Sequence, residues 1–311
     1  MTSQHVTADD RRTGPPGAGA PGGDAPRIGH VLCAHPGGLH RMAYREWPPA
    51  GEERGTVLCV HGLTRNGGDF DRLAGTLAAE GFRVVCPDIA GRGLSGRLPD
   101  AALYDIPQYV ADCTTLLARL DRVRVDWVGT SMGGMIGMAL ASLAGHPIRR
   151  LLLNDIGPVI ARAGLERIAG YVGDTTRYPD FAAAESALRR KMVSFGPHTD
   201  EEFRLLSRHH FVEREGAFVA HYDPSIAEAF ASVPTDDVAS WPLWSAIDCP
   251  VTVLRGEESD LLDARTAESM TRGGPDGAGP RARLETIAGV GHAPTLIRDE
   301  QVERVRRFLL D

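Results

Sequence analysis

The sequence predicts an α/β fold with a mostly parallel central sheet, helices on both of its faces and a helical segment inserted between later strands. Short apolar runs alternate with helix-like stretches from Thr56 to Asn154, which is the pattern of parallel βαβ units. The alternation stops over residues 159–247, where only helical patterns occur. We therefore expect three parts: a disordered N-terminal tail at 1–27, a core at 28–158 and 248–311, and a helical cap at 159–247.

The individual elements follow from the spacing of apolar residues. Residues 56–60 form a continuous apolar run, as in a strand buried on both faces, whereas Leu73, Leu77 and Ala78 recur at helical spacing. By such patterns, strands are expected at 30–34, 40–44, 56–60, 82–86, 125–128, 150–154, 251–255 and 282–287. Core helices are expected at about 70–80, 107–120, 264–270 and 300–310, and cap helices at about 163–172, 181–193, 200–213 and 224–231.

The charge balance argues against nucleic acids and anionic membranes as partners. The chain has 34 Lys and Arg residues against 41 Asp and Glu, a net charge of −7, and no basic stripe. Residues 1–27 lack the apolar centre of a signal peptide, and no apolar run is long enough for a transmembrane helix. The five cysteines show no Cys-x-x-Cys spacing, which favours reduced thiols. We therefore expect a cytoplasmic monomer or homodimer that acts on a small molecule.

The motif that carries the predicted chemistry is Gly129-Thr130-Ser131-Met132-Gly133, between an apolar strand and a helix. A serine hydroxyl is a weak nucleophile unless it is exposed beside a base and a site for the oxyanion. A sharp strand-to-helix turn exposes the serine in a strained conformation, and the flanking glycines leave room for neighbouring backbone. This context predicts Ser131 as the nucleophile, with the N-terminus of the helix directed at the reacting oxygen.

An oxyanion site is expected at His61-Gly62-Leu63, which ends the strand that should neighbour the serine strand. Ligands bind at these strand ends in open parallel sheets. Gly62 permits a tight turn, so the N–H of Leu63 can join the N–H of Met132 on a developing oxyanion. His61 precedes the serine in the chain and is expected to hold this loop rather than to act as the base.

The general base is expected near the C-terminus, where His292 follows the last strand between small residues. An acid should orient its imidazole from the loop after the strand that resumes the sheet. Asp260 is the predicted acid, because the turn must leave the strand before it points back at the histidine, and Glu258 and Asp155 are the alternatives. His292 would then take the proton of Ser131 and return it to the leaving group.

Substrate contacts are expected from the cap and from the loop beyond Leu63. Arg65 is expected at the substrate entrance, where it would distinguish anionic from neutral esters. Cap residues that could line an acyl or aromatic pocket are Met192, Phe195, Phe211, Tyr222, Trp241 and Trp244.

No cofactor or metal is expected. The stretch Gly91–Gly96 formally matches a dinucleotide-binding motif, but no apolar-faced helix follows it. His209 and His210 are adjacent on a predicted helix and would point apart, without further ligands at suitable spacing.

In this order, Ser131, Asp260 and His292 resemble the α/β-hydrolase superfamily, and the resemblance covers about residues 30–311. The motifs Gly129–Gly134 and Gly291-His292 look most like those of lid-bearing bacterial esterases and carbon–carbon bond hydrolases. The resemblance implies a Ser-His-Asp triad, no cofactor and a helical cap that shapes substrate choice. We expect a serine hydrolase that cleaves a small or medium carboxylic ester through an acyl-enzyme. The alternatives are a carbon–carbon bond hydrolase or a perhydrolase on the same triad, and a non-catalytic ligand-binding protein.

Overall fold

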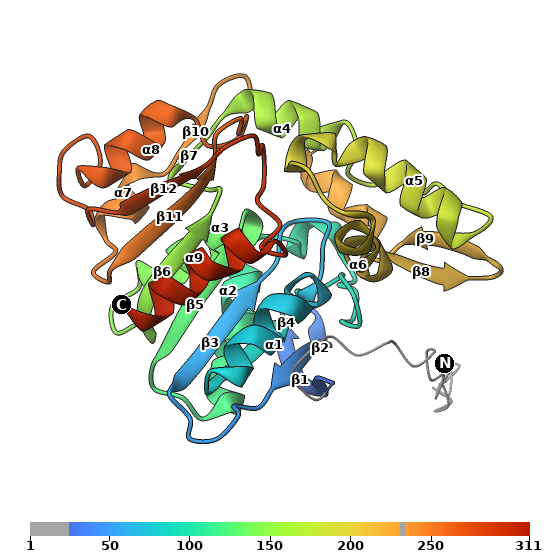
Figure 1. The fold of residues 1–311 in the computed structure, drawn as a ribbon, viewed down its shortest axis with the longest axis horizontal. Helices are drawn as coiled ribbons and strands as arrows, with labels where there is room; N and C mark the ends of the chain where they lie inside the picture. Colours follow the sequence, from blue (N-terminus) through green and yellow to red (C-terminus); the bar gives the residue numbers. More distant parts are fainter. Residues whose placement is uncertain (1–24, 231–233) are drawn as a thin grey trace.

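The structure is a computed structural model that describes residues 25–230 and 234–311. Residues 1–24, most of the predicted tail, lie outside the described residues, and the first strand begins at Arg27. The predicted fold class is confirmed, because an eight-stranded sheet is covered by helices on both faces (Figure 1). Its strands in chain order are β1 (Arg27–His35), β2 (Gly38–Trp47), β3 (Gly55–Val60), β4 (Phe82–Pro87), β5 (Val125–Thr130), β6 (Ile148–Asn154), β11 (Val251–Gly256) and β12 (Arg283–Ile287).

The strand order in the sheet is β1-β2-β4-β3-β5-β6-β11-β12. Strand β2 pairs antiparallel with β1 and β4, whereas all other neighbours pair in parallel. Strand β5, which precedes the serine motif, therefore lies between β3 and β6 near the middle of the sheet. The loops after β3, β5, β6 and β11 leave the sheet at the same edge, which is where a site in such a fold is expected.

Two helical layers bury the sheet. Helices α1 (Asp71–Ala79) and α9 (Asp299–Leu310) contribute to one apolar cluster with residues such as Leu73 and Val305, and both lie in front of the sheet in Figure 1. Helices α2 (Ile106–Leu120), α3 (Met132–Ala141) and α8 (Ala264–Thr271) contribute Leu116, Ile136 and Met270 to a second cluster. Two 3-10 turns, η1 (Gly67–Phe70) and η2 (Ala101–Leu103), complete the core.

Residues 159–247, here called the cap segment, leave the sheet after β6 and return before β11 (Figure 1). They carry more than the helices that the sequence predicts, because four short strands pair in two small ladders. The elements are β7 (Val159–Ile160), α4 (Arg162–Ala169), α5 (Phe181–Lys191), η3 (Val193–Phe195), α6 (Asp200–His210), β8 (Phe211–Arg214), β9 (Ala217–Ala220), η4 (Pro224–Phe230), β10 (Val238–Ala239) and α7 (Trp241–Ser245).

The predicted helix at 200–213 ends earlier, at His210, because the following residues form a hairpin. Strand β8 pairs antiparallel with β9 around Glu215 and Gly216, which both have positive φ, at 49° and 71°. Two consecutive positive φ angles are the conformation that a two-residue hairpin turn requires. The start of α6 is well defined, since Thr199 and Glu202 form a reciprocal capping box.

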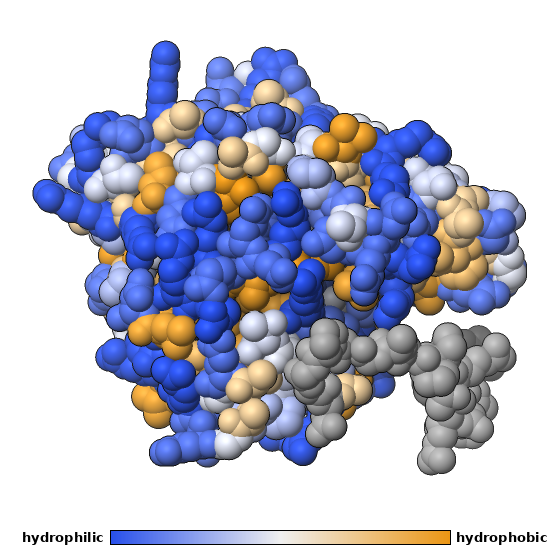
Figure 2. Space-filling view, in the orientation of Figure 1, coloured by the Kyte–Doolittle hydropathy of each residue, from blue (hydrophilic) through white to orange (hydrophobic). Residues whose placement is uncertain are grey.

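The face of the molecule seen in Figure 2 is mostly hydrophilic, as the many charged residues of the sequence indicate, and its hydrophobic residues form small separate areas. Among residues 25–230 and 234–311, each helix is too short or too polar to cross a membrane. The five cysteines are buried free thiols.

Candidate active site

Ser131 lies at a sharp turn between β5 and α3. Its backbone has φ 52° and ψ −116°, a strained conformation for a residue with a side chain. A Cβ on Gly129 would collide with the backbone of Gly133, and a Cβ on Gly133 would collide with the carbonyl of Val60. The turn therefore needs glycine at both positions, as the sequence motif indicates.

Ser131, His292 and Asp155 form a continuous hydrogen-bonded chain. The Ser131 Oγ lies 2.9 Å from His292 Nε2, and His292 Nδ1 lies 2.8 Å from Asp155 Oδ2. A carboxylate can only accept, so Nδ1 carries the proton and Nε2 is free to accept from the serine hydroxyl. Asp155 is fully buried and His292 is 6 % exposed, so solvent competes little for these bonds.

Asp155 occupies the position for which the sequence predicts Asp260. It directly follows β6, and its backbone N–H donates to the carbonyl of Leu254 on β11 at 2.7 Å. The Gly256 N–H and the Ser259 hydroxyl donate to its carboxylate at 2.8 and 2.6 Å. Three donors, His292 among them, therefore fix the orientation of this carboxylate.

The prediction that Asp260 contacts His292 is wrong. The Asp260 carboxylate instead accepts hydrogen bonds from Arg167 of α4, one of them at 2.8 Å. Burial opposes ionisation, but the bonds from Arg167 hold the pKa of Asp260 below its usual value. Glu258, the other alternative, is exposed. The physical reason is the strand order: β6 lies directly beside β5, so its last residue reaches the serine, whereas Asp260 lies four residues beyond β11 and faces the cap segment.

Asn154 is a residue of the site that the sequence analysis did not identify, whereas Asp155 was one of its alternatives for the acid. It is fully buried, and its side-chain amide donates to Thr130 Oγ1 at 3.0 Å and to the carbonyl of Pro294 at 2.7 Å. These bonds connect the residue before Ser131 with the loop that carries His292. Its polar side chain directly after three consecutive leucines of β6 was a usable signal, because buried polar groups need partners.

The backbone N–H groups of Leu63 and Met132, which the sequence predicts for an oxyanion site, are free of protein partners among residues 25–230 and 234–311. Met132 is the first residue of α3, where an N–H has no partner within the helix. Within the described residues, neither N–H donates to a protein acceptor. A fully buried Arg92 supports this region, since its Nε donates to the carbonyl of Leu63 at 2.9 Å and its Nη2 lies 3.5 Å from the sulfur of Met132.

His61 holds the loop that contains Leu63. Its Nε2 accepts from the N–H of Ile89 at 3.0 Å, and its Nδ1 donates to the carbonyl of Gly62 at 2.7 Å. Burial lowers the pKa of His61 to about 3, with a further contribution from the charge of Arg92 and against the effect of the Gly62 bond. The imidazole is therefore neutral at pH 7, which fits a structural role.

A cavity lies between this loop and the cap segment. Five of the residues predicted to contact substrate line it, namely Arg65, Met192, Phe195, Phe211 and Tyr222.

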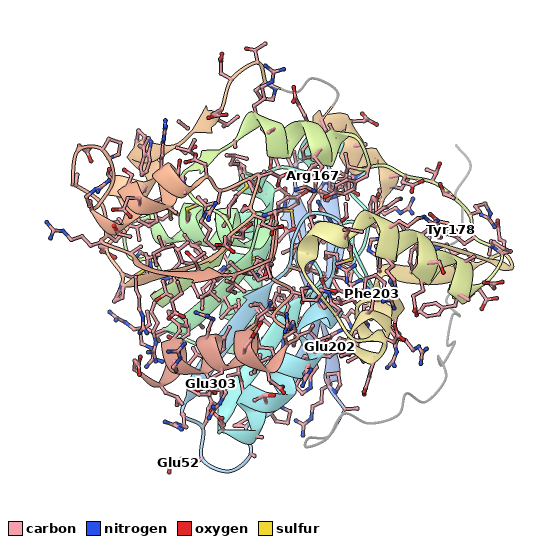
Figure 3. All side chains as sticks on the ribbon, turned by 45° about the horizontal axis from the view of Figure 1, so that its top comes forward. Glu52, Arg167, Tyr178, Glu202, Phe203 and Glu303 are labelled. Atoms are coloured by element: carbon pink, nitrogen blue, oxygen red, sulfur yellow. The ribbon has the colours of Figure 1, made fainter. Side chains whose placement is uncertain are left out.

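The two predicted tryptophans are not among the residues that line this cavity. Trp244 is fully buried in the main core cluster, and Trp241 packs partly buried against the same cluster. Both belong to α7, beyond the predicted cap helices, and both lie close to Gly274 before β12. Their role is therefore the packing of the core. In Figure 3, Arg167 and Tyr178 mark two separate regions of the cap segment, and only Tyr178 lines the cavity.

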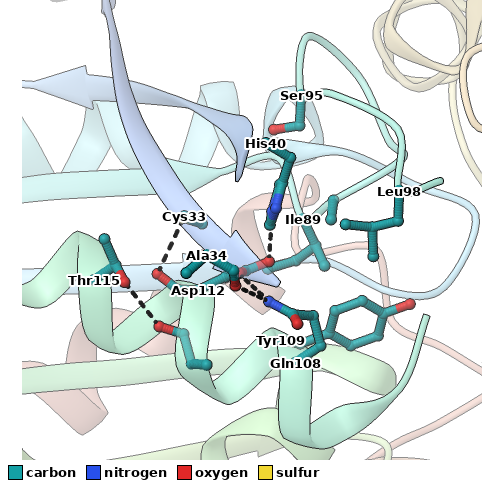
Figure 4. Close-up of polar contacts among 12 residues, drawn as sticks. Cys33, Ala34, His40, Ile89, Ser95, Leu98, Gln108, Tyr109, Asp112 and Thr115 are labelled. Atoms are coloured by element: carbon teal, nitrogen blue, oxygen red, sulfur yellow. Dashed lines mark hydrogen bonds and ion pairs between the residues drawn. The ribbon is translucent and has the colours of Figure 1, made fainter. Parts of the chain in front are cut away.

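A separate buried cluster joins β1, β2 and α2 (Figure 4). His40 Nε2 lies 2.9 Å from Asp112 Oδ2, and Gln108 donates to the other carboxylate oxygen at 2.7 Å. Cys33 completes the cluster, and burial followed by the charge of Asp112 raises the pKa of its thiol to about 12. A protonated thiol and a carboxylate already satisfied by protein donors favour a structural hydrogen-bond cluster over a metal site.

Comparisons with known proteins agree with the fold and the site. Residues 55–298 match the family model of the alpha/beta hydrolase fold. The chain is 43 % identical to a 3-hydroxybutyrate-oligomer hydrolase of Cupriavidus necator, over 91 % of this chain and 98 % of that protein. It is 28 % identical to an esterase of Escherichia coli, over 82 % and 93 % of the two chains.

A crystal structure of an alpha/beta hydrolase from Novosphingobium aromaticivorans superimposes with a TM-score of 0.81 at 34 % identity, covering 93 % of this chain and 99 % of that one. The matches in sequence and in structure thus span the core and the cap segment together. The chain belongs to the α/β-hydrolase family and is a hydrolase related to enzymes that cleave esters.

Proposed function

We propose that this protein hydrolyses carboxylic esters through an acyl-enzyme on Ser131. The observation that carries the proposal is the hydrogen-bonded chain from Ser131 through His292 to Asp155, at 2.9 and 2.8 Å. Nucleophile, base and orienting acid are thus within hydrogen-bond reach of one another, which is the geometry that serine catalysis requires.

In the proposed mechanism, Ser131 attacks the ester carbonyl while His292 Nε2 takes the hydroxyl proton. The N–H groups of Leu63 and Met132 stabilise the negative charge that develops on the carbonyl oxygen. His292 then gives the proton to the departing alcohol, and a water molecule repeats the sequence to release the acid. Asp155 keeps the imidazole in the tautomer that lets Nε2 act as the base and stabilises the imidazolium.

The proposed substrates are short linear oligomers of a 3-hydroxy acid. The Cupriavidus necator relative is a hydrolase of 3-hydroxybutyrate oligomers, and the alignment covers nearly the whole of both chains. The cavity beside the oxyanion loop combines apolar side chains with a few polar ones, as binding sites for small molecules usually do. We therefore expect cleavage of the ester bond between two small acid units.

The test is release of 3-hydroxybutyrate from its linear dimer and trimer, measured with the wild-type protein and with Ser131→Ala. The proposal expects turnover of the oligomers by the wild type and a loss of about 10⁴-fold or more in Ser131→Ala. Turnover of a vinylogous diketone with no turnover of the oligomers would instead assign carbon–carbon bond cleavage. Peroxide-dependent acyl transfer in place of hydrolysis would assign a perhydrolase.

A further inference from the structure

The cavity contains a guanidinium that is anchored along one edge only. Arg65 Nε and Nη2 donate to the Asp69 carboxylate at 2.7 and 2.6 Å, and Nη2 also donates to the carbonyl of Leu206 on α6 at 2.9 Å. The Arg65 side chain is 13 % exposed, so it is held between the core loop and the cap segment. A fork fixed in this way is preorganised, because little side-chain entropy remains to be lost on binding.

The opposite edge of this guanidinium has no protein partner. Within the described residues, Arg65 Nη1 is buried without a hydrogen bond, and so is Nδ1 of His210, which lines the same cavity. Burial lowers the pKa of His210 well below its usual value, and the charges of Arg65 and Lys191 act in the same direction. A buried donor that lacks a partner is unfavourable unless a ligand or water satisfies it.

The other charged groups around the cavity are paired. Lys191 forms an ion pair with Asp174 on the cap side, and the acid beside Arg65 is Asp69, whose two oxygens face Nε and Nη2. No carboxylate among the described residues contacts Nη1. Among the charged residues that line the cavity, Arg65 is therefore the one with a donor left unsatisfied.

Residues that line the cavity are linked to both the oxyanion loop and the histidine loop. Thr64 and Arg65 directly follow Leu63, whose N–H belongs to the proposed oxyanion site. Phe195 also lines the cavity, and the preceding residue, Ser194, accepts a hydrogen bond from the N–H of Gly291 at 2.6 Å. Gly291 directly precedes His292. The cavity lining is therefore connected to the oxyanion loop and to the histidine loop, while Ser131 and His292 themselves are not among the lining residues.

We infer that the cavity binds the free carboxylate of the ester substrate, with Arg65 Nη1 as its principal donor. This inference rests on the proposed function and narrows it to esters that end in a free acid. A linear oligomer of a 3-hydroxy acid has such an end, and the apolar walls formed by Leu188, Met192 and Phe195 accommodate its alkyl groups. Arg65 is thus a specificity-determining residue that separates anionic from neutral esters.

The test compares two substrates with the same scissile bond, the linear 3-hydroxybutyrate dimer as its free acid and as its methyl ester. Arg65→Gln should lower kcat/KM for the free acid by about 10- to 100-fold, because a hydrogen bond to a charged group is lost. The methyl ester should change by less than about threefold, since it makes no such bond. An equal loss on both substrates, or no loss on the acid, would overturn the inference.

The matched control is Arg204→Gln, an exposed arginine on α6 that does not line the cavity, and it should leave both substrates unaffected. A second variant avoids the anchoring bonds of Arg65. Thr176→Asp places a carboxylate at an exposed position on the cavity wall and should lower kcat/KM for the free acid alone by about threefold or more, through like-charge repulsion. A loss shared by the methyl ester, or none, would contradict the inference.

Binding to the inactive Ser131→Ala protein separates this inference from the proposed function. Calorimetry should show that the free-acid dimer binds Ser131→Ala at least about tenfold more tightly than it binds Ser131→Ala/Arg65→Gln. If the wild type cleaves no ester but this difference is found, the proposed function fails and the carboxylate site stands. If the oligomers are cleaved but binding does not depend on Arg65, the proposed function stands and the carboxylate site fails.

Discussion

The sheet edge that carries Ser131 and the cap segment differ in how their polar groups are held. At the sheet edge, Asn154 and Asp155 are fully buried and each forms several hydrogen bonds. In the cap segment, the Arg162 and Glu166 side chains of one ion pair are 51 % and 49 % exposed. Exposed pairs of this kind contribute little stability, whereas a buried network fixes one geometry.

This difference indicates separate roles, with catalysis at the sheet edge and substrate preference in the cap segment. A rigid sheet edge holds reacting groups within the narrow limits that catalysis needs, and a less constrained segment can vary to suit a substrate. The cap segment has its own small apolar cluster around Phe203, Leu188 and Phe211, separate from the two clusters that enclose the sheet. Substitutions at the sheet edge should therefore reduce the rate on all esters, and substitutions in the cap should change the preference among them.

The largest difference in kcat is expected between variants of Asp155 and Asp260, the two acids considered as partners of His292. Asp155→Asn should lower kcat on p-nitrophenyl butyrate by about 10³- to 10⁴-fold, because the amide no longer holds His292 in the required tautomer. Asp260→Asn should change kcat by less than about tenfold, since it loses only a partly exposed bond to Arg167. Steady-state kinetics on the two purified variants measures which acid orients His292. A larger loss of kcat in Asp260→Asn than in Asp155→Asn would refute the assignment of this role to Asp155.

A buried histidine should make the core sensitive to acid. The pKa of His61 is lowered to about 3 in the folded protein, whereas the unfolded chain takes up this proton near its ordinary value of 6.5. Its contribution to stability is therefore complete above pH 6.5 and is lost as the pH falls toward 3. From this group alone, the free energy of unfolding should fall by about 2–3 kcal/mol between pH 6.5 and 4.5.

Urea unfolding at both pH values measures this effect, with His61→Gln as the comparison. The variant lacks the titrating group, so its stability should fall less over the same interval, even if it starts lower. An equal fall in both proteins would show that His61 is not responsible for the acid sensitivity.

The smallest effect is expected in the cap. Phe195→Ala removes a ring from the cavity wall and should shift the preference among linear dimers of 3-hydroxy acids toward those with a longer side chain on the unit that carries the free acid, by about tenfold in relative kcat/KM. Phe181→Ala is the matched control, because Phe181 packs against Phe218 and does not line the cavity. The same preference in both variants would mean that the cavity does not receive the acid-bearing unit.

Local patterns predicted most of the core and two members of the site. Ser131 was identifiable because its turn requires glycine at both flanking positions, and His292 because one histidine follows the last strand between small residues. The acid was not identifiable in the same way. Asp155 and Asp260 both follow strands that end at one edge, and only the neighbour relation of β5 and β6 distinguishes them.

The cap was harder to predict because tertiary pairing overrides helical pattern there. Residues 211–214 continue the apolar spacing of α6, yet they pair with 217–220 once the turn at Glu215 and Gly216 forms. Trp244 has the character of a pocket residue by composition alone, but the close approach of Gly274 and Gly279 places it in the core. Such contacts depend on residues distant in the chain.

The most direct test of the account is the mass of the intact protein after treatment with a fluorophosphonate, which reacts with an activated serine. The wild type should gain one adduct, Asp260→Asn should gain it at a similar rate, and Ser131→Ala should gain none. Asp155→Asn should react more slowly by at least about 100-fold, because His292 is no longer oriented as a base. An adduct on Ser131→Ala, or an unmodified wild type, would contradict the claim that the sheet edge carries the chemistry.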